Sequence, residues 1–262
     1  MGERQARKAA AFRALHEGEP FVIPNPWDAG SAKVLAVLGF RALATTSSGF
    51  AFTLGRADGG ASLDEVVAHV RALDAATALP LSVDLESGHG DPAVAVARVA
   101  DAGAVGGSIE DWDPVSGIFG LDEAVERLAA AVEAARRLGF PFTLTARAEN
   151  YVRGNPDLSD TIERLQAYER AGADVLYAPG LRDGEQIAAV FEAVAKPVNV
   201  LARPGLTFDE IVDAGARRIS VGGGLAWAAV NALAAAAQDL RSGGGFASLA
   251  APAQLREWLG EA

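Results

Sequence analysis

Short apolar runs alternate along the chain with longer amphipathic stretches that are rich in alanine. In residues 121–139 the apolar positions recur every three or four residues, which is the spacing of a helix that buries one face. The runs between these stretches are short and rich in residues that favour strands. The eight predicted strands span residues 21–26, 42–48, 79–86, 106–111, 142–147, 175–180, 198–202 and 218–224.

Glycine marks the end of several predicted helices, immediately before the next strand. A left-handed residue, usually glycine, commonly closes the last turn of a helix at this position. The phrase Ala-Gly-Ala recurs at three of these ends, which indicates a repeated strand-helix unit. The glycines are Gly103, Gly139, Gly172 and Gly215.

Strands that alternate with helices in this way are typical of parallel sheets. Eight parallel strands joined by crossover helices close most naturally into a barrel, and about 250 residues is the usual size of a TIM barrel. We therefore predict an α/β fold, a (β/α)8 TIM barrel. The alternative is an open doubly wound sheet, but no Gly-x-Gly-x-x-Gly motif follows the first strand.

The 262 residues suit one large α/β domain. We assign residues 1–241 to a catalytic barrel, and residues 242–262 to a glycine-rich linker and a C-terminal helix of the same domain. The linker is the Ser-Gly-Gly-Gly run at 242–245. A terminal helix after a flexible hinge often docks on the body of the protein or on a neighbouring subunit.

Composition and charge exclude several classes of protein. Hydrophobic residues make up 50% of the chain and charged residues 22%, as in ordered globular proteins. No apolar run reaches the roughly 18 residues that span a bilayer, and the N-terminus lacks the apolar segment of a signal peptide. The formal net charge is -11, and no basic run exceeds two residues. We expect a cytoplasmic protein without a membrane or nucleic-acid partner.

Polar residues gather at the predicted C-terminal strand ends, where the active site of a TIM barrel lies. Asp84 and Glu86 end the third strand on one face, Glu110 ends the fourth, and Arg147 ends the fifth across the mouth. Three buried carboxylates repel one another unless a cation or protons neutralise them. The chain has no cysteine and no clustered histidine, so oxygen ligands point to Mg²⁺ or Mn²⁺. Arg147 would then bind a substrate carboxylate or phosphonate.

Structural roles compete with these interpretations. The pair Asp84 and Glu86 also suits a helix N-cap or a solvated turn, so the metal site is one of three readings. We expect Asp28 to cap a helix, and Asp91 followed by proline to be an N-cap. The glycines at 222–224 suit either an anion cradle or a tight turn.

Several motifs, in their order and spacing, resemble the isocitrate lyase and phosphoenolpyruvate mutase superfamily over nearly the whole chain. The resemblance implies a (β/α)8 barrel, commonly with a terminal helix exchanged between the subunits of a homodimer or homotetramer. It also implies Mg²⁺ at the barrel mouth. The motifs are PNPWDAGSAKVLAVLGF, TTSSGFAFTLGRADG, SVDLESGHGDP, GGSIED, LTARAEN and RISVGGGL.

The resemblance also implies a role for each matching residue. Asp84 is similar to the acid that binds the metal directly, whereas Asp58, Glu86 and Glu110 are similar to acids that hold it through water. Among these, Asp58 and Glu110 are assigned to catalysis together with Arg147. The residues implied in substrate binding are Thr46, Ser47, Ser48, Gly49, Asp84, Arg147 and Asn199.

The loop after the fourth strand departs from the family pattern. The lyases carry a Lys-Lys-Cys-Gly or Lys-Arg-Cys-Gly loop, whereas residues 110–123 read EDWDPVSGIFGLDE without cysteine. The family's mutases and hydrolases have Lys and Asn in the same place, and both are missing here. Isocitrate or methylisocitrate cleavage by the cysteine route is therefore not expected. The usual Asp-x-Asp at the third strand is Asp-x-Glu here, which preserves the charge.

The superfamily acts on 2-oxo or 2-hydroxy acids through an enolate-like intermediate. We therefore expect a Mg²⁺-dependent lyase or hydrolase that cleaves a C–C bond in a small, oxaloacetate-like acid. One alternative is C–P cleavage or a phosphoryl mutase reaction on phosphonopyruvate or phosphoenolpyruvate. Another is a non-catalytic protein that binds 2-oxo acids on the same fold.

Overall fold

Eight parallel strands form one sheet in the computed structural model, which describes residues 2–260. The order in the sheet is β1-β10-β9-β8-β7-β4-β3-β2. All eight predicted strands are confirmed, although each is shorter than the run that predicted it. The strands are β1 (Phe21–Ile23), β2 (Leu43–Ala44), β3 (Leu81–Asp84), β4 (Gly106–Glu110), β7 (Thr143–Arg147), β8 (Val175–Tyr177), β9 (Val198–Leu201) and β10 (Arg218–Ser220).

The sheet curls into a nearly closed barrel, which confirms the predicted fold class. The two ends of the sheet, β1 and β2, meet just beyond their paired residues. The amide of Ala44 donates to the carbonyl of Pro24 over 3.1 Å, and the side-chain amide of Asn25 donates to the carbonyl of Thr45 over 2.9 Å. The first bond joins the last residue of β2 to the segment that follows β1, and the second joins the two segments that follow these strands.

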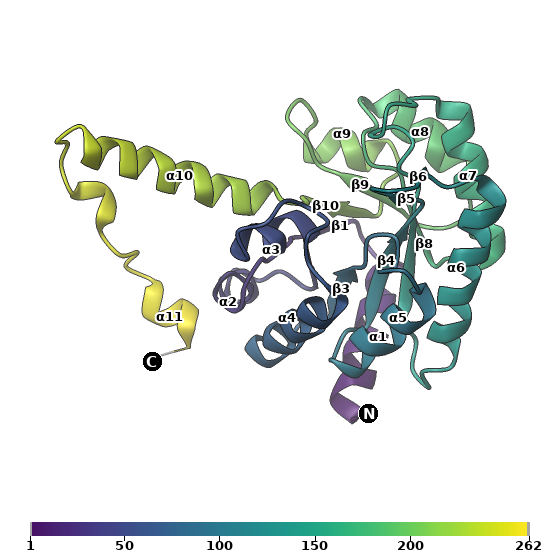
Figure 1. Ribbon diagram of the computed structural model, residues 1–262, viewed down its shortest axis with the longest axis horizontal. Coiled ribbons are helices and arrows are strands. Elements are labelled where there is room, and N and C mark those ends of the chain that lie inside the picture. Colours follow the sequence, from purple (N-terminus) through teal and green to yellow (C-terminus); the bar gives the residue numbers. More distant parts are fainter. Residues whose placement is uncertain (1, 261–262) are drawn as a thin grey trace.

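Helices surround the barrel, as Figure 1 shows. The predicted caps are confirmed, because Asp28 accepts from the amide of Ser31 and Asp91 caps a helix that begins with Pro92. The four glycines predicted to end helices all have positive φ. The surrounding helices are α2 (Ala29–Val37), α3 (Ser47–Thr53), α4 (Leu63–Ala76), α5 (Pro92–Asp101), α6 (Leu121–Arg136), α7 (Leu158–Ala171), α8 (Gly184–Ala193) and α9 (Phe208–Asp213).

The first helix, α1 (Glu3–Leu15), closes the N-terminal end of the barrel. Its Phe12 is fully buried in a small apolar cluster with residues of β1 and β2. Gly106 begins β4 beside this ring, and a Cβ there would come within 2.8 Å of Phe12. Glycine at 106 therefore lets the helix sit close against the strands. With this end covered, the barrel interior is open at the opposite end.

Burial of His16, just after α1, predicts acid-sensitive stability. Burial, and secondarily the charge of Arg218, lowers the pKa of His16 to about 3, whereas an unfolded imidazole titrates near 6.5. The unfolded state therefore takes up the proton first, and stability falls as the pH drops from about 6.5 toward 3. The free energy of unfolding is measured in urea at pH 7 and at pH 5. We expect its decrease between these two pH values to be smaller in His16→Gln than in the native protein, by at most about 2 kcal/mol. An identical pH slope in the variant would contradict the assignment, and His69→Gln measures the share of the other buried histidine.

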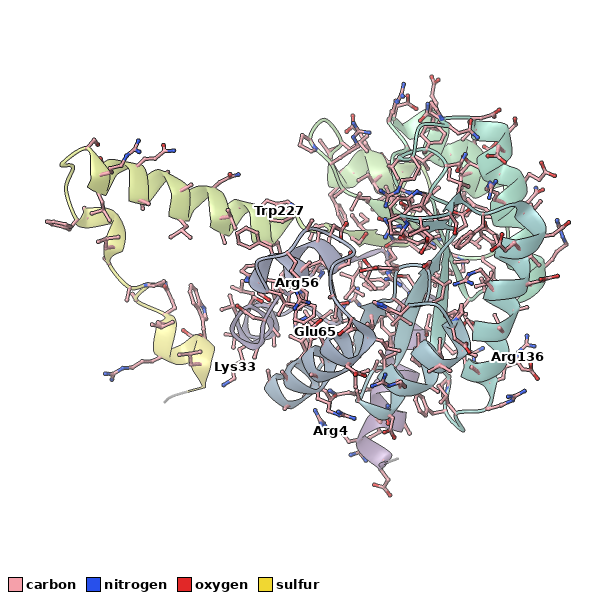
Figure 2. All side chains as sticks on the ribbon, in the orientation of Figure 1. Arg4, Lys33, Arg56, Glu65, Arg136 and Trp227 are labelled. Atoms are coloured by element: carbon pink, nitrogen blue, oxygen red, sulfur yellow. The ribbon has the colours of Figure 1, made fainter. Side chains whose placement is uncertain are left out.

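The C-terminal segment leaves the barrel and returns to it. Helix α10 (Gly224–Arg241) extends outward, and the chain then passes through η1 (Ala247–Leu249) to α11 (Leu255–Leu259). Helix α11 packs against α2 of the same chain, where the ammonium of Lys33 donates to the carbonyl of Leu259 over 3.1 Å. The labelled Lys33 faces α11 in Figure 2.

The predicted C-terminal helix is thus found, while its exchange between subunits stays a prediction. Residues 261–262 of the predicted segment 242–262 lie outside the described part of the chain. Within residues 2–260, no helix has the length and apolar character needed to cross a membrane.

Candidate functional site

Two cavities open at the C-terminal ends of the barrel strands. The inner cavity, of about 180 Å³, lies within the barrel mouth, and the outer cavity, of about 280 Å³, lies above the acidic strand ends. Ser47, Asp58 and Arg147 line both. Every predicted site residue lines one or both cavities except Gly49. Only the inner cavity is lined by Thr46, Ser48, Asp84 and Asn199, and only the outer cavity by Glu86 and Glu110.

Strand register brings three of the predicted residues together. Strand β4 lies between β3 and β7, so Asp84 pairs with Ser108, and Glu110 pairs with Arg147. The Nη1 atom of Arg147 lies 3.1 Å from Glu110 Oε2 and 3.7 Å from Asp84 Oδ2. Arg147 was expected across the mouth from the acids, but it lies directly beside them because its strand follows β4 in the sheet.

Glu86 departs from the predicted geometry. It was expected on the same strand face as Asp84, but β3 ends at Asp84, and the backbone of Glu86 turns to φ +51°. The amide of Glu86 donates to Asp84 Oδ1 over 3.3 Å. His89 also has a positive φ, of 48°, and lines the outer cavity with Glu86. Two non-glycine residues in this conformation are strained, and such strain clusters at functional sites.

The protein supplies too few cations to keep the acids in this region fully ionised near neutral pH. Burial raises the pKa of Glu86 to about 7, with the charges of Asp84 and Asp58 adding to the effect. Burial also raises the pKa of Glu110, despite the opposing charge of Arg147. A nearby cation would favour the ionised forms of these groups. The pKa of Arg147 is itself held above its usual value by Glu110 and Glu149, although burial opposes this.

The donor set suits a hydrated Mg²⁺ ion rather than a site built from several protein ligands. Within residues 2–260, no three His, Asp or Glu side chains converge closely enough to hold a metal ion together. Mg²⁺ usually keeps several waters and binds through one or two carboxylates. Asp84 as a single direct ligand, with Asp58, Glu86 and Glu110 reached through water, fits both the spacing and the uncompensated charge.

The segment 46–49 is the beginning of a helix and not the end of a strand. Strand β2 ends at Ala44, and α3 begins at Ser47 with Thr46 as its N-cap. The hydroxyl of Thr46 accepts from the amide of Gly49 over 3.3 Å and lies 3.2 Å from Ser48 Oγ. The amide of Gly49 is therefore already used, whereas Ser47 and Ser48 face the inner cavity.

A tight turn at Gly222, where φ is +51°, brings the end of β10 against the start of α3. Gly223 caps α10, and a Cβ at this position would lie 2.8 Å from Ser48 Oγ. Gly222 and Gly223 also line the inner cavity. The predicted turn is therefore found, while the role of anion cradle stays a prediction.

Glu149 is a candidate functional residue that the sequence analysis did not assign. It is fully buried, pairs through Oε1 with Arg147 Nε, and accepts from Arg153 Nε over 3.0 Å. Its own amide donates to Asp111 Oδ1 over 2.7 Å. Glu149 thus fixes the orientation of the guanidinium of Arg147. Its place in the LTARAEN motif, two residues after Arg147, was the available signal.

The loop after β4 forms a short hairpin over the outer cavity. Its strands are β5 (Trp112–Asp113) and β6 (Gly117–Ile118). The guanidinium of Arg153 stacks on the ring of Trp112, with 3.5 Å between Cζ and the ring centroid. The carboxylate of Asp113 accepts from the amides of Val115 and Ser116, which holds the hairpin turn.

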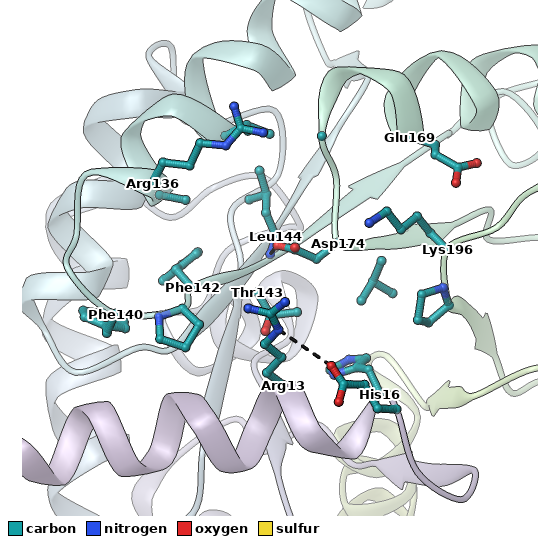
Figure 3. A pocket seen from close by; sticks show the side chains of 17 residues that line it. Arg13, His16, Arg136, Phe140, Phe142, Thr143, Leu144, Glu169, Asp174 and Lys196 are labelled. Carbon is teal, nitrogen blue, oxygen red and sulfur yellow. Dashed lines mark hydrogen bonds and ion pairs between the residues drawn. The ribbon is translucent and has the colours of Figure 1, made fainter.

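A larger cavity of about 440 Å³ opens at the opposite end of the barrel (Figure 3). It lies between the end of α1 and the loops that precede β7, β8 and β9. Its three cations are balanced by three acids, and it lies away from the catalytic end of the fold. We therefore do not consider it the active site. The charged residues are Arg13, Arg136, Lys196, Glu17, Glu169 and Asp174.

Comparison with known proteins gives matches over most of the chain. The sequence pattern of the phosphoenolpyruvate phosphomutase family matches residues 12–241. The 2-methylisocitrate lyase of Escherichia coli (strain K12) is 33% identical in an alignment of 222 positions that covers 77% of this chain and 73% of the lyase.

Solved structures are similar over almost the whole chain. A Burkholderia cenocepacia J2315 protein, provisionally described as a lyase or mutase, has a TM-score of 0.94 and 51% identity, covering 98% of this chain and 97% of its own. Oxaloacetate acetylhydrolase bound to its product oxalate has a TM-score of 0.87 and 29% identity, covering 98% and 94%. Phosphonopyruvate hydrolase with oxalate and Mg²⁺ shares the fold at 24% identity and a TM-score of 0.85, covering 97% and 95%.

Proposed function

Because the chain belongs to the phosphoenolpyruvate phosphomutase family, we propose that it is a Mg²⁺-dependent enzyme that cleaves a C–C bond in an oxaloacetate-like acid. The observation that carries this proposal is the excess of buried acid around Arg147 at the mouth of a small polar cavity. The relatives in this superfamily include a lyase and a hydrolase of small acids, which supports an enzyme.

Asp84 would hold the metal directly, and Asp58, Glu86 and Glu110 would hold its waters. The ion would act as a Lewis acid on the oxo group of the substrate. This role is supported by the contacts of Ser108 and Arg147, which approach the two oxygens of the Asp84 carboxylate from two sides. Glu110 is held by Arg147, so it would stay close to the ion without being its first ligand.

The substrate carboxylate would lie against the beginning of α3. Ser47 and Ser48 line the inner cavity there, and hydroxyl groups bind carboxylates as donors. Within residues 2–260, the ion pairs of Arg147 use Nε and Nη1, so Nη2 is the nitrogen left for a substrate oxygen. Its fixed positive charge would stabilise the negative charge that develops as the C–C bond breaks.

A substrate panel tests the type of bond that is broken. Oxaloacetate, phosphonopyruvate, 2-methylisocitrate and dimethylmalate are each offered with Mg²⁺, and pyruvate, CO2, oxalate and phosphate are measured. We expect turnover of oxaloacetate or of a 2-hydroxy diacid. Phosphate release from phosphonopyruvate would favour C–P cleavage instead. Metal-dependent binding of oxalate without any turnover would favour the non-catalytic alternative, which the missing cysteine and lysine loop motivates.

We also propose that the protein is a homodimer or homotetramer in which α10 packs on a second copy. Of the 18 residues of this helix only Ala226 is buried, and Leu233 is 67% exposed. Trp227 lies near the start of α10 (Figure 2). Its ring packs edge-on against the ring of Phe52. An exposed apolar helix surface of this kind is typical of a site that packs against another protein chain.

Light scattering of the eluted protein tests this assembly. We expect a mass of two or four chains for the native protein and a lower mass for Leu233→Asp, because a charge in an apolar interface is costly. Val115→Asp, at the exposed tip of the hairpin, is the matched control and should leave the mass unchanged. A native protein that elutes as a single chain would rule the assembly out.

A further inference from the structure

Arg218 is a buried cation without an acidic partner. The side chain begins β10, is 4% exposed, and donates through Nη1 to Thr145 Oγ1 over 3.1 Å. Among residues 2–260, no carboxylate lies within ion-pair distance of its guanidinium, and its buried Nε has no hydrogen-bond partner. Burial lowers the pKa of Arg218 to about 10, so the group is still charged near pH 7. An unpaired buried charge destabilises a fold unless something else compensates it.

The guanidinium lines the inner cavity beside a second unsatisfied group. Arg218 pairs in register with Asn199, so both side chains point into the barrel. Asn199 is 1% exposed, and its Nδ2 donates to Ser220 Oγ over 3.0 Å, while its Oδ1 has no partner. Because a serine hydroxyl can donate as well as accept, the amide can turn and present its NH₂ group to the cavity.

A row of neighbouring side chains connects Arg218, at the floor of the inner cavity, to Asp84, the predicted metal ligand. Thr145, which accepts from Arg218, pairs in register with Ser108. The hydroxyl of Ser108 in turn lies 3.4 Å from Asp84 Oδ1. The inner cavity is bounded by Asp84 at one end of this row and by Arg218 at the other. A small molecule held at Asp84 can therefore extend toward the guanidinium.

We propose that Arg218 and Asn199 form an anion subsite at the floor of the inner cavity, which takes the second carboxylate of a 2-oxo or 2-hydroxy dicarboxylic acid. The inference rests on the proposed function, because that function places the first carboxylate against the beginning of α3 and the oxo or hydroxy group at the ion beside Asp84. The charge of Arg218 pairs with the distal carboxylate, and the amide of Asn199 donates to it. A monocarboxylic acid leaves both groups unpaired, so the subsite selects dicarboxylic acids.

Malate and lactate are a matched pair of probes, since both are 2-hydroxy acids and only malate has a second carboxylate. Their affinities are measured by calorimetry with Mg²⁺ in the native protein, in Arg218→Met, and in the control Arg217→Met, whose exposed side chain precedes Arg218. We expect Arg218→Met to weaken malate binding by about 10- to 100-fold, because one charged hydrogen-bonding group is lost. Lactate binding should stay unchanged, and Arg217→Met should behave like the native protein.

Thermal unfolding without ligand separates a binding role from a structural one. Removal of an unpaired buried charge should leave the melting temperature of Arg218→Met equal to or above the native value. A lower melting temperature together with equal losses of malate and lactate binding would overturn the subsite and make Arg218 structural. Phosphate or chloride that stabilises the native protein but not Arg218→Met, with no preference for malate, would also overturn it in favour of an inorganic anion.

The outcomes distinguish this inference from the proposed reaction. If the protein turns over oxaloacetate and Arg218→Met leaves the ratio of the malate and lactate affinities unchanged, the subsite alone is overturned. If the protein turns over no acid but binds malate more tightly than lactate, and Arg218→Met loses this preference, the proposed reaction is overturned and the subsite is supported. A native protein that binds neither probe would overturn the subsite, whereas the proposed reaction is decided by the turnover of oxaloacetate alone.

Discussion

Asp84→Ala is expected to lose Mg²⁺ binding and Mg²⁺-dependent turnover together. Asp84 is the one direct metal ligand that we propose, and Glu86 and Glu110 are expected to reach the ion only through water. Loss of the Lewis acid should cost several kcal/mol of transition-state stabilisation, or at least about a thousandfold in rate. Calorimetric titration with Mg²⁺ and the rate on oxaloacetate are the two measurements.

The isosteric variant Asp84→Asn separates charge from packing. It keeps the shape beside Ser108 and should fold as the native protein does, as circular dichroism would verify. It should nevertheless bind Mg²⁺ far more weakly, because a neutral amide replaces the carboxylate. Native-like Mg²⁺-dependent turnover in either variant would mean that another acid holds the metal.

Arg147→Lys is expected to weaken oxalate binding by about 1–3 kcal/mol. Glu149 and Glu110 hold the planar guanidinium through Nε and Nη1 and thereby aim its remaining nitrogen. A lysine ammonium is a point charge and cannot keep these two contacts while it also binds a substrate oxygen. Calorimetry with oxalate and Mg²⁺ measures the loss.

Arg153→Lys is the control for Arg147→Lys. Arg153 shares Glu149 with Arg147, but its guanidinium stacks on Trp112 at the hairpin. If the effect came only from a disturbed Glu149, both variants would weaken oxalate equally. Unchanged oxalate affinity in Arg147→Lys would refute the assignment of this residue to the substrate.

The barrel could be predicted because its signal is repeated. Eight short apolar runs, amphipathic stretches and glycines at helix ends all favour the same strand-helix unit, and all eight strands are found. The ends of the strands were harder to predict from the sequence, because a strand stops where its ladder of hydrogen bonds stops. Residues 42–48 illustrate this, because two of them form β2 while Ser47 already begins α3.

The candidate site could be predicted only in part. Asp84, Glu110 and Arg147 follow from the rule that barrel strands carry function at their C-terminal ends. The placement of Glu86 failed because its positive φ is a local backbone feature that the alternation of residues does not reveal. Arg153 reaches the site from a loop, through contacts that no sequence pattern encodes.

Arg218 escaped the sequence analysis for a different reason. It opens its strand, whereas the functional signal in a barrel sequence lies in the residues that close strands. The proposed role of Arg218 depends on the absence of an acid beside its buried guanidinium. The sequence does not show this absence, because it depends on how the chain folds. The same holds for Asn199, whose candidate role was found but whose unpaired oxygen was not.

The most direct test of the proposed reaction follows oxaloacetate by carbon-13 NMR with Mg²⁺ and protein. Free Mg²⁺ itself promotes decarboxylation, so Asp84→Ala at equal concentration serves as the background. We predict that the native protein converts oxaloacetate to pyruvate and CO2, or to oxalate and acetate, much faster than the variant does, and that a chelator abolishes the difference. Equal rates for the native protein, the variant and Mg²⁺ alone would contradict cleavage of oxaloacetate by this site.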